Sequence, residues 1–126
     1  MSKEPVCLLI VDDSAAIRKI LLRVLQQTEI PMGSVFEAAD ERQALEILQQ
    51  NKVSLILSDI NMPNMDGIEL LRAVRSKTEW RDVPMIMITT EGSQAKVAEA
   101  AELGATSYVR KPFTVDQMRH KLLPLL

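Results

Sequence analysis

The sequence predicts an α/β domain built from five strand–helix units, (βα)₅, whose strands form one parallel, doubly wound sheet. Two observations support this prediction: short apolar runs alternate with segments of helical period, and the alternation continues along the whole chain. Crossovers of this kind place helices on both faces of a parallel sheet. A length of 126 residues suits one domain, so we treat residues 1–126 as a single unit.

The first two units begin at residues 6–11 and 34–38. Residues 6–11 are continuously apolar, which is typical of a strand buried on both faces. After the second strand, Asp40 is the expected N-cap of a helix, with Gln43 as its capping-box partner. Two helical stripes of apolar residues follow these strands: Ile17, Ile20, Leu21, Val24 and Leu25 in the first, and Ala44, Leu45 and Leu48 in the second.

The third unit contains a long turn. Residues 53–60 form an apolar run rich in Leu and Ile, and residues 59–67 add the Pro, Asn and Gly of a turn. Residues 80–84 interrupt the chain before a fourth strand at residues 85–89. The helix between the turn and this interruption is marked by Ile68, Leu70, Leu71 and Val74.

The last two units end the domain. The helix expected over residues 93–103 is rich in Ala, and Gly104 suits the C′ position that closes it. A short fifth strand is expected at residues 107–110. Thr114 then caps the last helix, with Gln117 at its N3 position, and Pro124 should end that helix.

The composition argues against several classes of function. A net charge of −2 favours neither direct binding to nucleic acid nor attachment to an anionic membrane. No apolar run approaches the roughly 20 residues that cross a bilayer, and the N-terminus does not resemble a secretory signal. The lone Cys7 is interpreted as a small core residue. The expected location is a reducing cytoplasm.

Polar residues follow four of the expected strands. Ligands of an open α/β sheet bind beyond the carboxyl ends of its strands. The residues expected at that edge are Asp12 and Asp13 at the end of the first strand, Asp59 at the end of the third, Thr89 at the end of the fourth and Lys111 at the end of the fifth.

These residue types suit phosphoryl chemistry. Three carboxylates in one crevice repel one another, and Mg²⁺, which prefers one or two carboxylates together with water and phosphate oxygens, would relieve that repulsion. A carboxylate can act as the nucleophile that carries an aspartyl phosphate. Lys111 would supply a second cation and Thr89 a hydroxyl donor to the phosphoryl oxygens.

Each residue also has a simpler interpretation. Asp12 and Asp13 could cap the first helix, Asp59 could be a turn residue, Thr89 could be an ordinary strand residue and Lys111 a solvated charge. The site interpretation is favoured because four separate strand ends supply the needed chemistry together.

Four segments resemble the receiver domain of bacterial response regulators, closest to its single-domain chemotaxis type. They are residues 11–14 (VDDS), 58–67 (SDINMPNMDG), 89–91 (TTE) and 108–113 (YVRKPF). The resemblance covers essentially the whole chain, and the order and spacing of the motifs agree with the family. It implies the flavodoxin-like fold, with five parallel strands in the order 2-1-3-4-5.

The resemblance also implies residue roles. Asp59 would be the phosphoacceptor, and Lys111 would pair with the phosphoryl group. Mg²⁺, the one implied cofactor, would be held by Asp12, Asp13, Asp59 and the backbone carbonyl of Asn61.

A conformational switch is part of the same resemblance. Thr89 would move toward the phosphoryl group, and Tyr108 would turn into the space behind it. Asn61 and Glu91 would tune dephosphorylation, and the Lys111–Pro112 bond would be cis. The implied output face, on the fourth helix, fifth strand and fifth helix, includes Lys96, Glu99, Tyr108, Arg110, Gln117 and Lys121.

The implied partners are a sensor histidine kinase or phosphotransfer domain and a downstream protein target. We expect no nucleic acid, no membrane and a monomer that catalyses only its own phosphorylation and dephosphorylation, without being an enzyme for other substrates. One departure from the family is Thr90, where a smaller residue is usual, so the exchange rates of the phosphoryl group are open.

Four rival interpretations remain. A flavodoxin-like electron carrier would need a phosphate-cradling loop where this chain has Asp12 and Asp13. A haloacid-dehalogenase-like phosphatase would need an acid at the position of Asn61. The domain could instead be an unphosphorylated docking receiver, or a receiver cut from a longer regulator.

Overall fold

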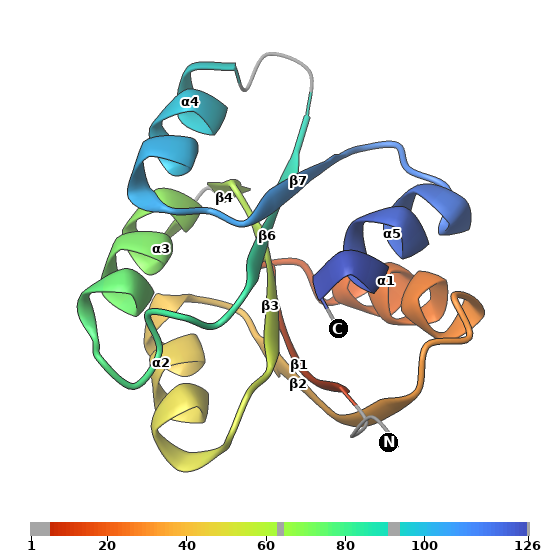
Figure 1. Ribbon diagram of the computed structural model, residues 1–126, viewed down its shortest axis with the longest axis horizontal. Coiled ribbons are helices and arrows are strands. Elements are labelled where there is room, and N and C mark those ends of the chain that lie inside the picture. Colours follow the sequence, from red (N-terminus) through yellow and green to blue (C-terminus); the bar gives the residue numbers. More distant parts are fainter. Residues whose placement is uncertain (1–5, 63–64, 91–93, 126) are drawn as a thin grey trace.

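The computed structural model describes residues 6–62, 65–90 and 94–125. A five-stranded parallel sheet in the order β2-β1-β3-β6-β7 forms its centre (Figure 1). This order is the predicted 2-1-3-4-5, because β6 and β7 are the fourth and fifth strands of the expected series. The sheet strands are β1 (Val6–Val11), β2 (Met32–Ala38), β3 (Leu55–Asp59), β6 (Met85–Thr89) and β7 (Ser107–Arg110).

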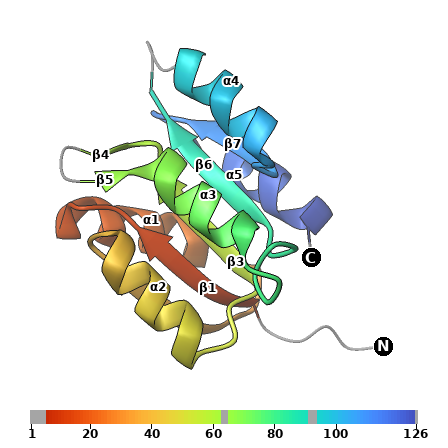
Figure 2. The same ribbon diagram turned by 90° about the vertical axis from the view of Figure 1, so that its left-hand side faces the viewer.

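Five α-helices connect and cover these strands within the described residues. On one face of the sheet lie α1 and α5, and on the other lie α2, α3 and α4 (Figures 1 and 2). The helices are α1 (Ala15–Gln27), α2 (Glu41–Gln50), α3 (Gly67–Ser76), α4 (Gln94–Leu103) and α5 (Val115–Leu122), and a 3₁₀ turn over Leu123–Leu125 follows α5.

Two apolar clusters form the core, one on each face of the sheet. Alternate residues of β1 enter different clusters: Leu8 and Ile10 face α1 and α5, whereas Leu9 and Val11 face α2 and α3. Every residue of β3 and β6 is buried, because these central strands are covered on both sides. Both strands are therefore rigid supports for the residues at their carboxyl ends.

The predicted helix ends are largely confirmed. Thr114 and Gln117 form the reciprocal capping box of α5. Asp40 accepts from the Gln43 backbone N–H at 2.8 Å, as predicted, but Gln43 Oε1 accepts from Ala39 N rather than from the cap residue itself. The capping box of α2 is thus closed one residue earlier than expected.

Gly104 ends α4 in the left-handed region, with φ of +99°. The backbone N–H of Ala105 donates to the carbonyl of Ala100, which closes the last turn of the helix. The predicted start of α4 at Ser93 lies outside the described residues. Pro124 lies within the 3₁₀ turn after α5, in agreement with a helix that ends before it.

Two predictions about individual residues are wrong. Ile20 was expected to face the core but is 52% exposed, because the predicted stripe is wider than the face that α1 buries. Cys7 is half-buried at the amino end of β1 and is not a fully enclosed core residue. Within the segment predicted as a turn, β4 (Asn61–Met62) and β5 (Met65–Asp66) pair as a short antiparallel ladder, which the sequence did not indicate.

None of the helices that the structure describes is both long and apolar enough to cross a membrane.

Trp80, the single tryptophan, should be a poor reporter of events at the carboxyl edge of the sheet. It is buried between α3 and the amino end of β6, with the Lys77 ammonium 5.9 Å from its ring centroid. Titration with Mg²⁺ should leave its emission nearly unchanged, whereas unfolding in denaturant should shift that emission strongly. A large quench by Mg²⁺ in the folded protein would contradict this expectation.

Candidate functional site

The strand order brings the predicted site residues to one edge of the sheet. Val11 of β1 pairs with Ser58 of β3, and Asp59 of β3 pairs with Ile88 of β6. Thr89 of β6 pairs with Arg110 of β7. The strands β1, β3, β6 and β7 therefore end side by side, as expected for ligand sites of open α/β sheets.

Lys111 lies between two of the carboxylates. Its Nζ is 3.4 Å from Oδ2 of Asp59 and 3.9 Å from Oδ2 of Asp12. The Lys111 side chain is only 26% exposed, and the side chains of Asp59 and Asp12 are 10% and 2% exposed. Because water screens these partly buried charges weakly, the Lys111 ammonium interacts appreciably with both carboxylates.

The backbone and one oxygen of Asp12 are held firmly. Its N–H donates to the carbonyl of Ala38, and its Oδ1 accepts from the N–H of Ser14 at 2.9 Å. Its Oδ2 is buried and has no hydrogen-bond partner among the described residues. A buried carboxylate oxygen without a donor is costly, which marks this atom as a position for a cation.

The environment of Asp12 favours its protonated form. The pKa of Asp12 is raised to about 6, mainly by burial and also by the neighbouring Asp59 charge. The Ser14 N–H and Lys111 act in the opposite direction but do not compensate. A divalent cation would remove this conflict by stabilising the ionised carboxylate.

The oxygen donors present fit Mg²⁺. Asp12 and Asp59 converge, and Mg²⁺ commonly takes only one or two carboxylates and keeps several waters. No group of three or more Asp, Glu, His or Cys side chains converges as a metal cage in the described part of the chain. The half-buried Asp13 is therefore not part of a preformed cage, and its role as a ligand stays a prediction.

Two predicted tuning residues cannot be placed by their side chains. Asn61 lies in β4, but its side chain lies outside the described part of the structure. Glu91 lies outside the described residues altogether.

The predicted switch residues lie beside the same edge. Thr89 is buried, and its hydroxyl donates to the carbonyl of Val109 at 3.5 Å. Tyr108 packs against the cluster that contains α3 and α4, and its hydroxyl donates to the carbonyl of Val97 in α4 at 3.4 Å. Burial raises the pKa of the Tyr108 hydroxyl above its ordinary value.

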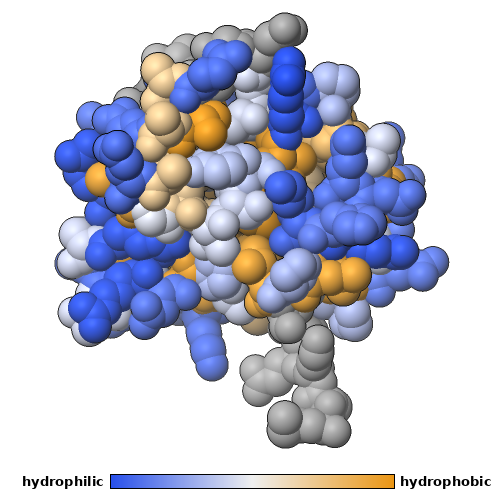
Figure 3. Space-filling view, turned by 45° about the horizontal axis from the view of Figure 1, so that its top comes forward, coloured by the Kyte–Doolittle hydropathy of each residue, from blue (hydrophilic) through white to orange (hydrophobic). Residues whose placement is uncertain are grey.

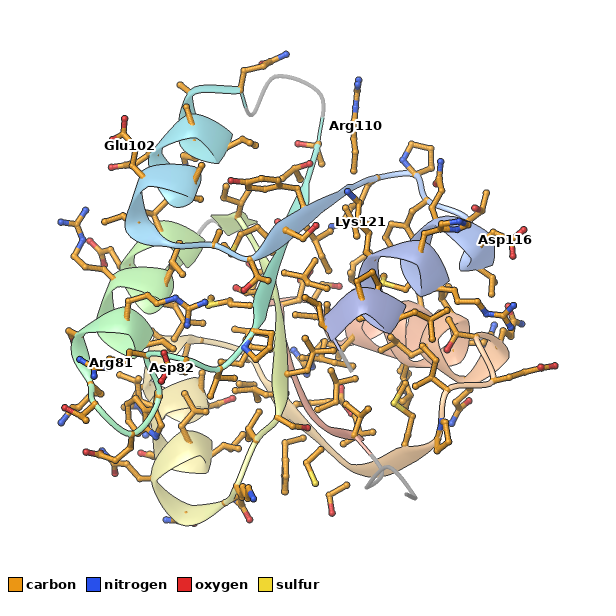
Figure 4. The ribbon with its side chains drawn as sticks, viewed as in Figure 1. Arg81, Asp82, Glu102, Arg110, Asp116 and Lys121 are labelled. Carbon is orange, nitrogen blue, oxygen red and sulfur yellow. The ribbon has the colours of Figure 1, made fainter. Side chains whose placement is uncertain are left out.

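Thr89 and residues of β7 and α5 border a hollow of about 480 Å³. Arg110, Lys111 and Lys121 give it a basic lining, and Figure 4 shows that Arg110 and Lys121 come from β7 and α5. Figure 3 looks onto this edge, where pale orange residues gather over α4 and blue residues border them on the α5 side. Four of the predicted output residues line the hollow: Tyr108, Arg110, Gln117 and Lys121.

The other two predicted output residues lie on α4, outside this lining. Glu99 instead forms an ion pair with Arg72 of α3 at 3.9 Å, and Lys96 is half-buried. The Lys111–Pro112 peptide bond is cis, as the resemblance implied.

Comparison with known proteins identifies the family. The model of the response regulator receiver domain matches residues 8–123. The chain belongs to the response regulator receiver family. A receiver domain of this kind accounts for the strand order and for the position of the acidic edge described above.

Chemotaxis proteins are among its relatives. The chain is 39% identical over 120 residues to a CheY homologue of Campylobacter jejuni, covering 94% of this chain and 91% of that protein. It is also 39% identical over 116 residues to CheY1 of Helicobacter pylori, with coverage of 91% and 92%.

Solved receiver structures share the same fold. The chemotaxis response regulator CheY4 of Vibrio cholerae matches with a TM-score of 0.84 and 36% identity, covering 98% of this chain and 100% of that one. A putative response regulator from Chloroflexus aurantiacus matches with a TM-score of 0.86 and 28% identity, with coverage of 97% and 98%.

The sequence interpretation did not recognise the steric role of Gly67 in this receiver domain. A Cβ added at Gly67 would lie 2.3 Å from the carbonyl oxygen of Asp59 and 2.9 Å from Cα of Ile60. The start of α3 is thus pressed against the backbone that carries Asp59. The glycine was visible in the turn motif, but its close approach depends on how α3 returns to β3.

Gly67→Ala should displace the backbone at Asp59. We expect a loss of roughly 1–3 kcal/mol in unfolding free energy, the usual range for overpacking, together with weaker Mg²⁺ binding. Gly104→Ala is the matched control: it should also destabilise, because φ there is +99°, yet leave Mg²⁺ affinity unchanged. Denaturant unfolding and calorimetric Mg²⁺ titration measure both effects, and an unchanged Mg²⁺ affinity in Gly67→Ala would contradict the prediction.

Without Mg²⁺, stability should fall as pH rises from about 4 to 6. The folded pKa of Asp12 is about 6 against an ordinary value of 3.8, so the folded state binds more protons in this window. The stabilisation is fully present below pH 4 and lost above pH 6, and it amounts to at most about 3 kcal/mol.

Asp12→Asn should remove this part of the pH dependence, and saturating Mg²⁺ should reduce it in the unaltered protein. Unfolding free energies measured between pH 4 and 8, with and without Mg²⁺, test the prediction. Identical profiles for Asp12→Asn and the unaltered protein would show that another group is responsible.

Proposed function

We propose that this chain is a phosphorylation-activated response regulator that accepts a phosphoryl group on Asp59 in a Mg²⁺-dependent reaction. The donor would be a phosphohistidine of a sensor kinase or phosphotransfer domain. The observation that carries the proposal is the arrangement of Lys111 beside the Asp59 carboxylate, next to a buried Asp12 oxygen without a donor.

The residues support an in-line transfer. An oxygen of Asp59 would attack the phosphorus, forming an O–P bond as the N–P bond to the donor imidazole breaks and that nitrogen keeps the electron pair. Lys111 is close enough to pair with the charge that develops on the phosphoryl oxygens. Mg²⁺, when bound, would neutralise charge on the same oxygens.

The transfer would be read out through Thr89 and Tyr108. The new phosphoryl group adds about −1.5 to −2 charges and strong acceptor oxygens. Thr89 and Tyr108 now make long hydrogen bonds of 3.5 and 3.4 Å, which are weak and cost little to exchange. Their rearrangement would reshape the hollow along β7 and α5, where a protein target would bind.

Several finer points belong to the same proposal. The relatives named as CheY proteins favour chemotaxis as the pathway. The chain would act in the cytoplasm as a monomer and would catalyse only its own phosphorylation and dephosphorylation. A docking receiver that is never phosphorylated is the main alternative.

Intact mass after incubation with acetyl phosphate and Mg²⁺ tests the proposal. One phosphoryl group should be gained, and the gain should be absent in Asp59→Asn and when Mg²⁺ is chelated. Asp82→Asn is the matched control: this exposed acid lies in the α3–β6 connection, far in Figure 4 from the labelled Arg110, and its loss should not affect the gain.

Sampling must be faster than hydrolysis of the acyl phosphate. No gain in the unaltered protein under these conditions, or a full gain in Asp59→Asn, would refute the proposed function. The first outcome would favour the alternative, a docking receiver that is never phosphorylated.

A further inference from the structure

A basic residue of α1 binds the same turn that carries the acidic pair. Nη1 of Arg18 donates to the backbone carbonyl of Asp12 at 2.5 Å, and its Nε donates to Oε1 of Glu37 at 2.9 Å. The Arg18 side chain is only 15% exposed. These two contacts join α1, the end of β1 and the end of β2 through one guanidinium.

Arg18 completes the immobilisation of Asp12. The N–H of Asp12 already donates to Ala38, and its Oδ1 accepts from Ser14. The carbonyl of Asp12 accepts from Arg18. Among the described residues, Asp12 Oδ2 is the one buried side-chain nitrogen or oxygen atom without a hydrogen-bond partner. The peptide that links Asp12 to Asp13 is therefore held at its oxygen, and this peptide sets where the Asp13 side chain begins.

Glu37 fixes the direction of the guanidinium. It lies one residue before Ala38, whose carbonyl accepts from Asp12, so the end of β2 supports the turn in two ways. A guanidinium is planar and presents its donors at fixed angles, so an anchored Nε directs Nη1 at a definite point. An ammonium on a flexible stem cannot hold both acceptors in this way.

We propose that Arg18 is a positioning residue for Mg²⁺ binding: it holds the Asp12–Asp13 peptide so that their carboxylates are presented to the metal. The inference rests on the proposed function, since it assumes that the acidic edge binds Mg²⁺. Arg18 touches neither the metal nor the phosphoryl group in this account, and it acts through the backbone of Asp12.

A positioning role and a simple charge effect predict opposite results. Arg18 is a cation that contacts the turn proposed to bind Mg²⁺, so the loss of its charge alone should tighten Mg²⁺ binding. If Arg18 positions the ligands, its removal should weaken binding despite the gain in negative charge. Residues that orient metal ligands typically change metal affinity by about 10- to 100-fold.

The experiment compares calorimetric Mg²⁺ affinities of the full chain and three variants. Arg18→Gln should bind Mg²⁺ about tenfold more weakly, near the lower limit of that range. Arg18→Lys keeps the charge, and its Mg²⁺ affinity should fall between those of the unaltered chain and Arg18→Gln. A pure charge effect would instead leave the Mg²⁺ affinity of Arg18→Lys unchanged. Arg23→Gln removes an exposed charge from α1 and should bind at least as tightly as the unaltered chain.

Two further measurements separate the explanations. Thermal unfolding without Mg²⁺ shows whether Arg18→Gln is folded. If it is not, the Mg²⁺ affinity of Arg18→Lys tests the positioning role in its place. The mass gain of Arg18→Gln from acetyl phosphate should be reduced at low Mg²⁺ concentration. It should reach that of the unaltered chain when Mg²⁺ is saturating, because the phosphoacceptor itself is intact.

The outcomes distinguish this inference from the proposed function. Equal or tighter Mg²⁺ binding by Arg18→Gln, in a chain whose unaltered form binds Mg²⁺ and gains a phosphoryl group, would overturn the role of Arg18 alone. Absence of Mg²⁺ binding and of phosphorylation in the unaltered chain would overturn both.

Discussion

The close approach of two carboxylates at the carboxyl edge of the sheet is the constraint on which the rest of the structure depends. Asp12 follows β1, Asp59 ends the adjacent β3, and the Lys111 ammonium lies near both carboxylates. Like charges in a poorly hydrated crevice destabilise the fold unless cations enter. Under the proposed function, this conflict would favour the binding of a metal ion and a phosphoryl group at the edge.

The surrounding scaffold keeps the carboxylates from moving apart. The strands β3 and β6 are buried on both faces, and separate apolar clusters cover the two sides of the sheet. Gly67 lets the start of α3 press against the Asp59 backbone, and Arg18 holds the carbonyl of Asp12. The backbone could move the Asp12 and Asp59 carboxylates apart only by breaking these close contacts.

The opposite side of the edge is held less firmly. Thr89 and Tyr108 make long hydrogen bonds to backbone carbonyls, and they border a basic hollow along β7 and α5. A change in charge at Asp59 would therefore meet close backbone contacts at Asp12 and α3, but only weak side-chain hydrogen bonds at Thr89 and Tyr108. If Asp59 is phosphorylated as proposed, this asymmetry would give the signal a direction, from the acidic edge toward the hollow along β7 and α5.

Local patterns in the sequence determined the five strand–helix units, the cap of α5 at Thr114 and the glycine that ends α4, because each depends on residues near in the chain. The motifs also identified Asp12, Asp59 and Lys111 as partners at one edge. Only the tertiary structure decided that Ile20 faces solvent, that Gly67 touches the Asp59 backbone and that Arg18 reaches the Asp12 carbonyl. Those contacts join separate elements, and their distances follow from how the helices pack on the sheet, which no local pattern records.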